Sequence, residues 1–452
     1  MSFPRYPEYK DSGAKWLGEV PTYWTIRKCS YIGRLFGSES IPEDMVSSEE
    51  GGIPFLKVAS LSSDSTNVIS WDWYVSEQYH GTLRPAKHFV VFPKRGAAIF
   101  LNKVNVVNCK AVIDPNLMGW EILGHNVTEY FAYTLKCRVL SELADVSTVP
   151  QINNKHVAPE RFPVPPIEEQ QKIADFLDHE TAKIDTLIHE QKRLIELLKE
   201  KRQAVISHTV TKGLDPDVPM KDSGVEWLGD VPAHWTVVRV AALYTEAAEQ
   251  GTPQLPVLRV SIHHGVSDRE LSEEESDRKI TRIEDREKYK TVRPGDLVYN
   301  MMRAWQGGFG AVLVDGLVSP AYVVARPQDR TLSRYVEMLL RTTYAIEEMR
   351  SRSHGITDFR LRLYWDKFKT MKIVAPPLRE RELIMERIDH FMKQSGALEK
   401  EARTLIKLLQ ERRSALISAA VTGKIDVRDW KPRADESAFD AEVQQPETEI
   451  TA

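Results

Sequence analysis

The feature of this sequence that most constrains its fold is an internal repeat. Residues 10–25 read KDSGAKWLGEVPTYWT, and residues 221–236 read KDSGVEWLGDVPAHWT, at an offset of 211 positions. The same offset relates the Pro-Pro pair at 165–166 to that at 376–377, and the segment 200–207 to the segment 411–418. A repeat on this scale predicts two copies of one structural unit in tandem.

The matched segments enclose two interiors of equal length, residues 26–162 (module 1) and 237–373 (module 2), which share almost no identity. Constant flanks around divergent interiors are expected of one scaffold that holds two different recognition modules. The alternative is a duplicated domain that drifted without a binding role, but such drift seldom preserves both length and flanks. Strand patterns at 53–60, 87–93 and 297–299 and a helix pattern at 333–352 indicate mixed α/β modules.

Each module is followed by a segment with heptad spacing of apolar residues, and the first, residues 168–209, contains neither glycine nor proline. This spacing predicts two long helices that begin after the Pro-Pro pairs and end near Gly213 and Gly423. Since neither helix can bury its apolar stripe alone, we expect the two to pair with each other. Pairing with another protein or with a second copy is the alternative. The expected pairing residues are Leu177, Ile184, Leu187, Leu194, Leu198, Ile388, Leu398, Leu405 and Leu409.

The expected fold class is therefore α+β, with two tandem α/β domains, two long helices that form an antiparallel coiled coil, and a pseudo-twofold internal repeat. The expected parts are a first domain with its N-terminal flank (1–162), a helical spacer (163–213), a second domain (214–373), a second spacer (374–424) and an acidic, disordered tail (425–452).

Composition excludes several classes of protein. A hydrophobic fraction of 42% and a charged fraction of 28% are typical of globular chains, and no apolar run approaches the ~18 residues of a membrane span. The three cysteines are odd in number and widely spaced, which argues against a disulfide framework or a zinc site and favours a cytoplasmic location. Neither a metal nor another cofactor is expected. The net charge of −4 permits DNA binding without indicating it, because only the docking face must be positive.

Catalytic motifs are missing. The sequence has no GxxxxGK[ST] phosphate loop, and its glycine run at 307–310 neither follows a strand nor opens a helix as a dinucleotide site requires. The Pro-Pro pairs lack the preceding Asn and following aromatic residue of adenine methyltransferases. We therefore expect no catalytic residues.

Several segments together resemble the conserved regions of the specificity subunits of type I restriction–modification enzymes. They are WLG(E/D)VPxxW in both copies, the PP(I/L)xE helix start, and the segment 194–213, while residues 93–99 and 294–298 resemble that family's recognition domains. The resemblance covers the chain up to about Asp426. The second helix start departs from the pattern, because Arg379-Glu380-Arg381 stands where the first copy has Glu168-Glu169-Gln170.

The resemblance implies a non-catalytic, sequence-specific DNA-binding subunit. Each target-recognition domain would read one half of a split double-stranded DNA site, and the paired helices would fix the gap. Implied partners are two methyltransferase subunits, which methylate adenine, and through them motor-nuclease subunits that cleave DNA with ATP. An adaptor or structural coiled-coil protein is the alternative, against which the duplicated but divergent modules argue. A self-contained restriction–methylation enzyme is disfavoured by the missing motifs.

Base edges in the major groove are best read by Arg, Lys, Asn and Gln side chains, so loop residues of these types are the candidate DNA contacts. A solvated surface charge is the alternative for each. The candidates are Lys94, Arg95, Asn102, Lys103, Asn105, Arg303, Trp305, Gln306, Arg360 and Arg362.

Overall fold

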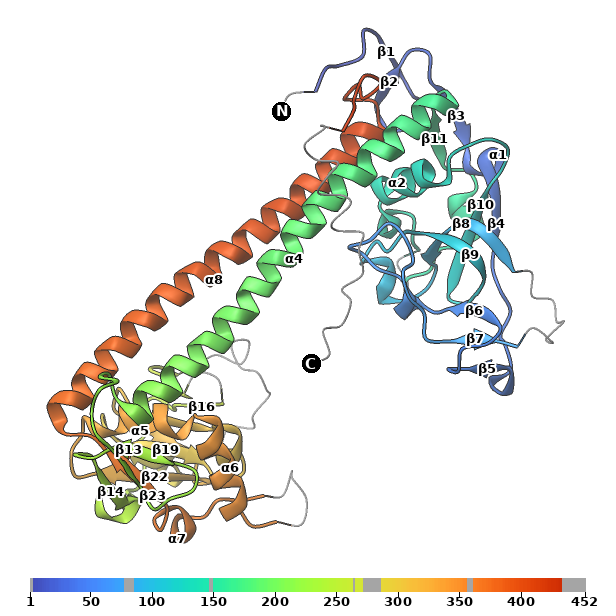
Figure 1. Ribbon diagram of the computed structural model, residues 1–452. Helices are drawn as coiled ribbons and strands as arrows, with labels where there is room; N and C mark the ends of the chain where they lie inside the picture. The colour runs from blue at the N-terminus through green and yellow to red at the C-terminus, as the bar shows by residue number, and fades with distance from the viewer. Residues whose placement is uncertain are drawn as a thin grey trace. The chain divides into compact units, whose positions relative to one another are not determined.

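The computed structural model describes residues 3–76, 85–145, 149–262, 265–270, 286–355 and 361–432. The chain divides into two compact units: unit 1 comprises Met1–Lys192 and Arg403–Ala452, and unit 2 comprises Arg193–Ala402. The two predicted long helices are confirmed as α4 (Ile167–Lys212) and α8 (Leu378–Val421) (Figure 1). Each helix is divided between the two units, with one part in unit 1 and the other in unit 2. Gly213 and Gly423, with φ of 82° and 72°, stand at their C-terminal ends, where glycine adopts this backbone conformation without strain.

Unit 1 contains a seven-stranded sheet in the order β4-β10-β8-β9-β6-β7-β5. Alternate side chains of its strand β8 face two cores: Val90 and Phe92 pack with helix α2 and the long helices, while Phe89 and Val91 pack on the other side. Burial on both faces explains why this strand is an unbroken apolar run. The elements are α1 (Cys29–Ile32), β4 (Gly33–Phe36), β5 (Val46–Ser47), β6 (Ile53–Leu56), β7 (Tyr74–Val75), β8 (Ala86–Pro93), β9 (Asn105–Ile113), β10 (Leu117–Ile122), α2 (Thr128–Arg138) and α3 (Asn154–Val157).

Unit 2 contains a four-stranded antiparallel sheet in the order β15-β22-β19-β20. The order β4-β10-β8-β9 in unit 1 is the same arrangement, also antiparallel throughout, so the two modules share a topology despite their divergent sequences. The helix predicted at 333–352 is two helices, because Thr342 caps the second one by accepting a bond from Ala345 N. The elements are β15 (Tyr244–Ala247), β16 (Val260–Ser261), β17 (Gly265–Val266), β18 (Lys290–Val292), β19 (Leu297–Asn300), β20 (Phe309–Ala311), β21 (Gly316–Val318), β22 (Tyr322–Pro327), α5 (Leu332–Leu340), α6 (Thr343–Arg352) and α7 (Trp365–Phe368).

The repeated flanks form the same small sheets in both units. In unit 1, β1 (Tyr9–Asp11) pairs with β2 (Glu19–Pro21) and β3 (Thr25–Lys28) with β11 (Arg161–Val164). Their counterparts in unit 2 pair in the same register: β12 (Met220–Asp222) with β13 (Asp230–Pro232), and β14 (Thr236–Arg239) with β23 (Lys372–Ala375). Trp24 and Trp235 are fully buried beside these sheets, as expected of packing anchors.

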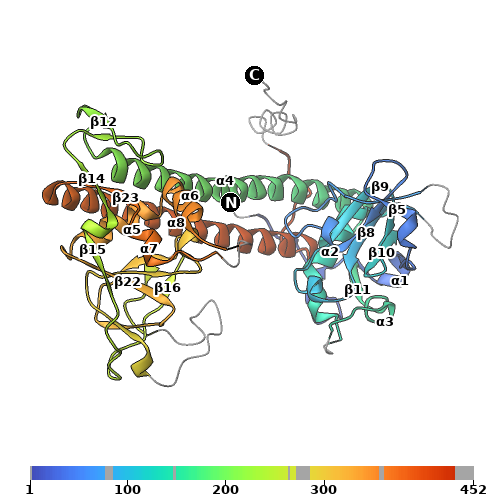
Figure 2. The ribbon, with the colours of Figure 1, turned by 90° about the horizontal axis from the view of Figure 1, so that it is seen from below.

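The long helices pair in an antiparallel sense within each unit (Figure 2). In unit 1, Ile184 and Ile188 form a buried cluster with Leu409, and Asp185 pairs with Arg413 at 2.9 Å. In unit 2, Arg202 contacts Ser395 and Glu399, each at 3.3 Å. The later part of α4 thus meets the earlier part of α8, as the sequence predicts.

The seam of this coiled coil differs from the predicted heptad register. Four predicted pairing residues are buried: Leu177, Ile184, Ile388 and Leu409. Leu198 is half-buried. Four more lie on the outer side of the helices with 40–49% of their surface exposed: Leu187, Leu194, Leu398 and Leu405. Three of these exposed leucines are followed by an isoleucine, and Ile188 and Ile195 are the buried members of their doublets. Because both members of a doublet are apolar, heptad spacing alone could not select between them.

The tail was expected to be disordered from residue 425, but residues 425–432 are ordered. Val427 is fully buried, Asp426 N donates to Pro4 O at 2.8 Å, and the Trp430 ring lies 5.3 Å from Phe176. The acidic composition of the tail obscured this short apolar segment, which packs on unit 1. Residues 433–452 lie outside the described residues.

The three cysteines are unpaired, with Cys29 buried and Cys109 and Cys137 partly exposed. Across the described ranges, no three His, Cys, Asp or Glu side chains gather where they could hold a metal ion. None of the helices described is both long and apolar enough to cross a bilayer.

Candidate nucleic-acid interface

Most of the candidate residues, four in module 1 and three in module 2, lie on equivalent turns. In module 1, residues 94–104 connect β8 to β9 and contain the short helix η3 (Ala97–Ile99). In module 2, residues 301–308 connect β19 to β20 and contain η7 (Ala304–Gln306). Because these strands occupy the same places in the two sheet orders, the β8–β9 turn and the β19–β20 turn are topological counterparts. These two turns cannot be aligned with each other from the sequence alone.

The start of the β8–β9 turn borders a hollow of about 640 Å³ whose lining includes Lys57, Trp73, Arg95 and Asn116, together with the carboxylates of Glu43 and Asp114. Lys57 Nζ lies 3.7 Å from the centre of the Trp73 ring, which is a cation–π contact. Arg95 is exposed, and burial together with repulsion from Arg95 lowers the pKa of the half-buried Lys94. Cations beside an aromatic ring and an amide suit contact with nucleic acid.

Two asparagines among the candidates have internal partners. Asn105 is fully buried: its Oδ1 accepts from Ser62 N at 3.1 Å and its Nδ2 donates to Ser65 O at 2.7 Å. Asn102 has φ of 49°, donates to Lys136 O at 2.8 Å and accepts from Leu140 N at 3.0 Å. A base contact by either amide would require these bonds to break, so neither asparagine is proposed as a base contact.

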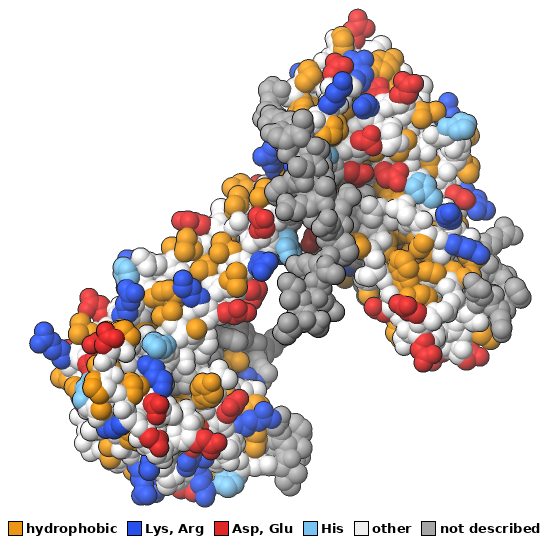
Figure 3. All heavy atoms as spheres, viewed as in Figure 1, with side chains coloured by type: hydrophobic (Ala, Val, Ile, Leu, Met, Phe, Trp, Pro, Cys, Tyr) orange, Lys and Arg blue, Asp and Glu red, His pale blue; other side chains and the backbone are white. Residues whose placement is uncertain are grey.

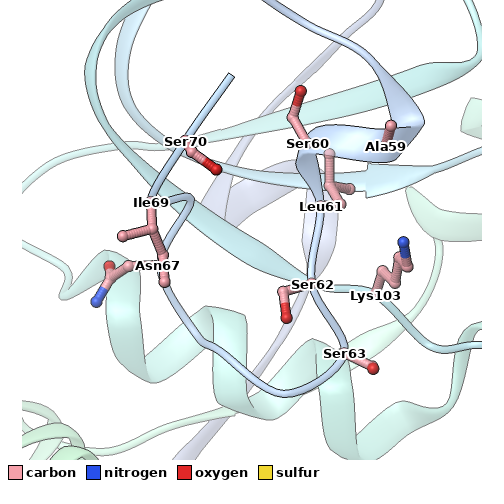
Figure 4. Close-up of a pocket in the computed structure, with 9 residues that line it drawn as sticks. All are labelled: Ala59, Ser60, Leu61, Ser62, Ser63, Asn67, Ile69, Ser70 and Lys103. Carbon is pink, nitrogen blue, oxygen red and sulfur yellow. The ribbon is translucent and has the colours of Figure 1, made fainter. Parts of the chain in front are cut away.

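Lys103, at the end of the β8–β9 turn, borders a second hollow of about 400 Å³ (Figure 4). One wall is formed by residues 59–63, and the opposite wall carries Asn67, Ile69 and Ser70. The structure therefore places Arg95 at the first hollow and Lys103 at the second.

In module 2, the β19–β20 turn presents Arg303, Trp305 and Gln306. Trp305 Nε1 donates to Met302 O at 3.1 Å, and the Arg350 guanidinium of α6 lies 5.5 Å from the Trp305 ring centre. Gln306 is exposed. Neither Arg303 nor Arg362 pairs with a carboxylate in the part of the chain that the structure describes.

Arg362 is brought beside this turn by backbone pairing. Leu363 N donates to Met301 O at 2.9 Å, and Arg362 pairs with His354 in an isolated antiparallel bridge. Arg303 and Arg362, some 60 positions apart in the chain, thus lie in one region of the surface of module 2. Arg360 lies outside the described residues.

Sequence reasoning missed Lys57, Trp73 and Arg350. Lys57 follows β6, whose parallel pairing with β9 brings it toward Arg95's hollow. Arg350 reaches the β19–β20 turn because α6 packs against η7. No local pattern marks these residues; only the strand order and the helix packing do.

Comparison with known proteins finds similarity over part of the chain. Residues 21–197 match the family model described as the type I restriction modification DNA specificity domain. The type I restriction enzyme MjaIX specificity subunit of Methanocaldococcus jannaschii is 27% identical over 205 residues, which are 43% of this chain and 44% of the relative. The putative MjaX specificity subunit of the same organism is 21% identical over 238 residues, 50% of this chain and 53% of the relative. The matches span about half the length of the curated relatives, or less.

A solved structure supports the fold. A chain from work on the complex assembly and conformational transition of the type I R-M system has a TM-score of 0.62 with this one at 13% identity, and covers 89% of this chain and 98% of its own. Residues 21–197 are therefore similar to a type I restriction modification DNA specificity domain, and the solved structure shows the fold that the chain shares with it.

Proposed function

We propose that this chain reads a bipartite double-stranded DNA site and directs adenine methylation and ATP-dependent cleavage by partner subunits. The observation that carries the proposal is the pair of equivalent turns: one topology presents Lys94 and Arg95 in module 1 and Arg303 and Gln306 in module 2. Arginine, lysine and glutamine are suited to base edges in the major groove, so a constant scaffold with different turns would read two different half-sites.

The exposed leucines of the long helices support the proposal that this chain binds partner subunits. Apolar side chains are visible at the surface along both helices (Figure 3). Clustered exposed apolar side chains mark surfaces that bind other proteins. We propose that methyltransferase subunits pack on them. In unit 1 these leucines are Leu187, Leu405 and Leu408, and in unit 2 they are Leu194, Leu197 and Leu398.

Exchange of module 1 tests the two-reader proposal. Residues 26–162 are replaced with the matching segment of a related subunit, and the methylated sites in the host genome are sequenced. We expect one half of the site to change and the other half and the gap to stay. If both halves changed together, the two modules would not read separately.

Insertion of one heptad into both long helices tests whether they set the gap. Seven residues lengthen a helix by about 10 Å, or roughly three base pairs of B-DNA. We expect a gap longer by about that amount with unchanged half-sites, whereas a single inserted residue turns the apolar stripe by ~100° and breaks the pairing. An unchanged gap in a folded, active heptad variant would place control of the spacing in the partner subunits.

A further inference from the structure

The turn between β8 and β9 exposes two adjacent apolar side chains. Phe100 is 60% exposed and Leu101 is 58% exposed, although Ile99 directly before them is fully buried in the core of unit 1. A single exposed apolar residue is ordinary, but an aromatic and an aliphatic side chain next to each other on a turn mark a surface that another molecule covers. We call Phe100 and Leu101 the apolar tip.

Both ends of the turn are fixed to the rest of unit 1. At its start, Gly96 N donates to Pro150 O at 3.0 Å. Directly after the apolar tip, Asn102 has φ of 49°, in the left-handed region that few residues other than glycine and asparagine adopt. Its side chain is bonded to Lys136 O and Leu140 N. A turn whose backbone is already fixed loses little conformational freedom when its tip inserts into a partner.

The charge of the turn indicates which kind of molecule covers the apolar tip. Residues 94–104 contain two lysines and one arginine and no acidic residue. Glu43 and Asp114, which line the hollow beside Arg95, offset part of this positive charge. The partner must therefore offer an apolar space flanked by negative charge. The stack of base pairs between the two phosphate backbones of a DNA duplex has both properties.

The equivalent turn of module 2 repeats this combination with different residues. Met302 is 42% exposed, and Arg303 follows it in residues 301–308, which contain no acidic residue. Met302 precedes η7, whereas the apolar tip of module 1 follows η3. Since the two modules share almost no identity, an exposed apolar side chain beside a cation on both turns indicates a common use.

We propose that the apolar tip inserts between two neighbouring base pairs of the bound DNA and bends the duplex there. The inference rests on the proposed DNA-reading function and adds a role distinct from contact with base edges or with the backbone. Insertion separates two stacked base pairs, and burial of Phe100 and Leu101 offsets that cost. Steps at which a pyrimidine precedes a purine separate most easily. Module 1 would thus recognise the deformability of its half-site as well as its base edges.

Energy transfer between dyes at the two ends of a short duplex measures the bend. The duplex carries the target found by sequencing methylated sites in the host genome, and the full chain is added at saturating concentration. We expect wild type to shorten the distance between the dyes and Phe100→Ala to abolish most of that change. Phe100→Trp should restore it, because tryptophan keeps a large flat ring. The matched control is Tyr31→Ala, which removes a side chain that is 74% exposed in α1 and should leave the bend unchanged.

Removal of one base at the separated step provides a second measurement. A fluorescent base analogue, placed in turn at each position of the half-site, brightens where it loses its stacking partner and so locates the step. A missing base there lowers the cost of separating the pairs, so wild type should bind that duplex about tenfold more tightly than the intact one. Phe100→Ala should show no such preference, because it has no large side chain to insert.

The outcomes separate the alternatives. A wild-type complex with a straight duplex, or a Phe100→Ala chain that bends it as wild type does, would overturn the inference. Weaker association of Phe100→Ala with purified methyltransferase subunit, with an unchanged bend, would make the apolar tip a protein docking surface and also overturn it. Because Phe100 is exposed, thermal unfolding of Phe100→Ala should match wild type, so a lost bend reports on the tip and not on folding. A wild-type chain that does not bind the duplex at all would remove the proposed function itself.

Discussion

The two units attach their modules to the long helices through different charged contacts. In unit 1 the contact includes a buried charged cluster, in which Arg413 bonds Asp185 and Asp64 O while Lys136 bonds the same loop. Arg413 is only 7% exposed. In unit 2, where α5 meets α8, Arg334 pairs with Asp389 at 2.9 Å, but both side chains are about half exposed. Apolar packing joins both modules to their helices, and the difference lies in these two charged contacts: that of unit 1 is buried, and the Arg334–Asp389 pair of unit 2 is exposed.

The starts of the long helices differ in the same way. Glu169 is buried and accepts bonds from Tyr6 at 2.6 Å, from Tyr23 at 3.0 Å and from Trp24 at 3.2 Å. Burial and the bond to Glu169 raise the pKa of Tyr23 to about 12, so it donates as a neutral phenol. The counterpart Glu380 accepts instead from His234 at 2.7 Å on the exposed side of unit 2.

The departure of the second helix start from the family pattern has a structural consequence. Gln170 is buried and bonds neutral partners, Val127 N and Pro165 O. Its counterpart Arg381 is also buried, but pairs with Asp329 and Thr331. The helix begins at the same place in both copies, since the Pro-Pro pair and the buried tryptophan are kept. The repeated residues therefore specify the scaffold, while the polar contacts around them involve different residues in the two copies.

Among the predicted substitutions, loss of Arg413 should lower the free energy of unfolding most. Arg413→Met leaves the half-buried Asp185 without its partner, so it should cost more than the loss of an exposed pair (~1 kcal/mol) and up to about 3 kcal/mol, the cost of breaking a buried pair. Arg334→Met in unit 2 should cost no more than about 1 kcal/mol, because the pair is exposed. Urea unfolding measures both, and hydrogen exchange in α2 and residues 62–65 locates the loss.

Arg412→Met is the matched control for Arg413→Met, because Arg412 is the exposed neighbour on the same helix. It should be near neutral. Equal costs for Arg413→Met and Arg334→Met would show that the two attachments do not differ in kind, and the contrast between the units would fail.

The sequence predicted the parts of this molecule that depend on local pattern. The long helices, their glycine ends, their antiparallel pairing and the buried tryptophans follow from heptad spacing and from the repeat. Which residues form the buried seam between the helices could not be predicted, because doublets such as Leu187-Ile188 offer two apolar residues for one buried position. The equivalence of the β8–β9 and β19–β20 turns was hidden because the modules share almost no identity.

Substitution of the two buried tryptophans sharpens the comparison of the helix starts. Trp24→Phe and Trp235→Phe both remove buried volume from matched positions, so the cavity cost is shared. Trp24 Nε1 also donates to Glu169, whereas Trp235 Nε1 is buried without a bond partner among the described residues. Trp24→Phe should therefore cost about 1 kcal/mol more than Trp235→Phe. Chemical denaturation of the two variants checks this; the reverse order would mean that Glu169 is satisfied by its tyrosines alone.

The smallest expected effect is a pH dependence confined to unit 1. Burial, with repulsion from Arg413, lowers the pKa of Lys136 from 10.5 to about 8, although Asp185 and Asp64 oppose the shift. Between these two pH values the unfolded chain holds the proton that the folded chain has released, so the free energy of unfolding contributed by Lys136 rises with pH. Below pH 8 this contribution is constant.

Lys136→Met removes that rise. The difference in free energy of unfolding between wild type and Lys136→Met should therefore increase from pH 8 toward pH 10 in favour of the wild type. Lys172→Met, a substitution at an exposed lysine of α4, corrects for the general loss of a lysine. Because module 2 has no counterpart of this loop contact among its described residues, hydrogen exchange should place the pH-dependent change in residues 62–65 and α2. A pH-dependent difference of the same size in α5 and α6 would show that the effect does not come from the charged cluster of unit 1.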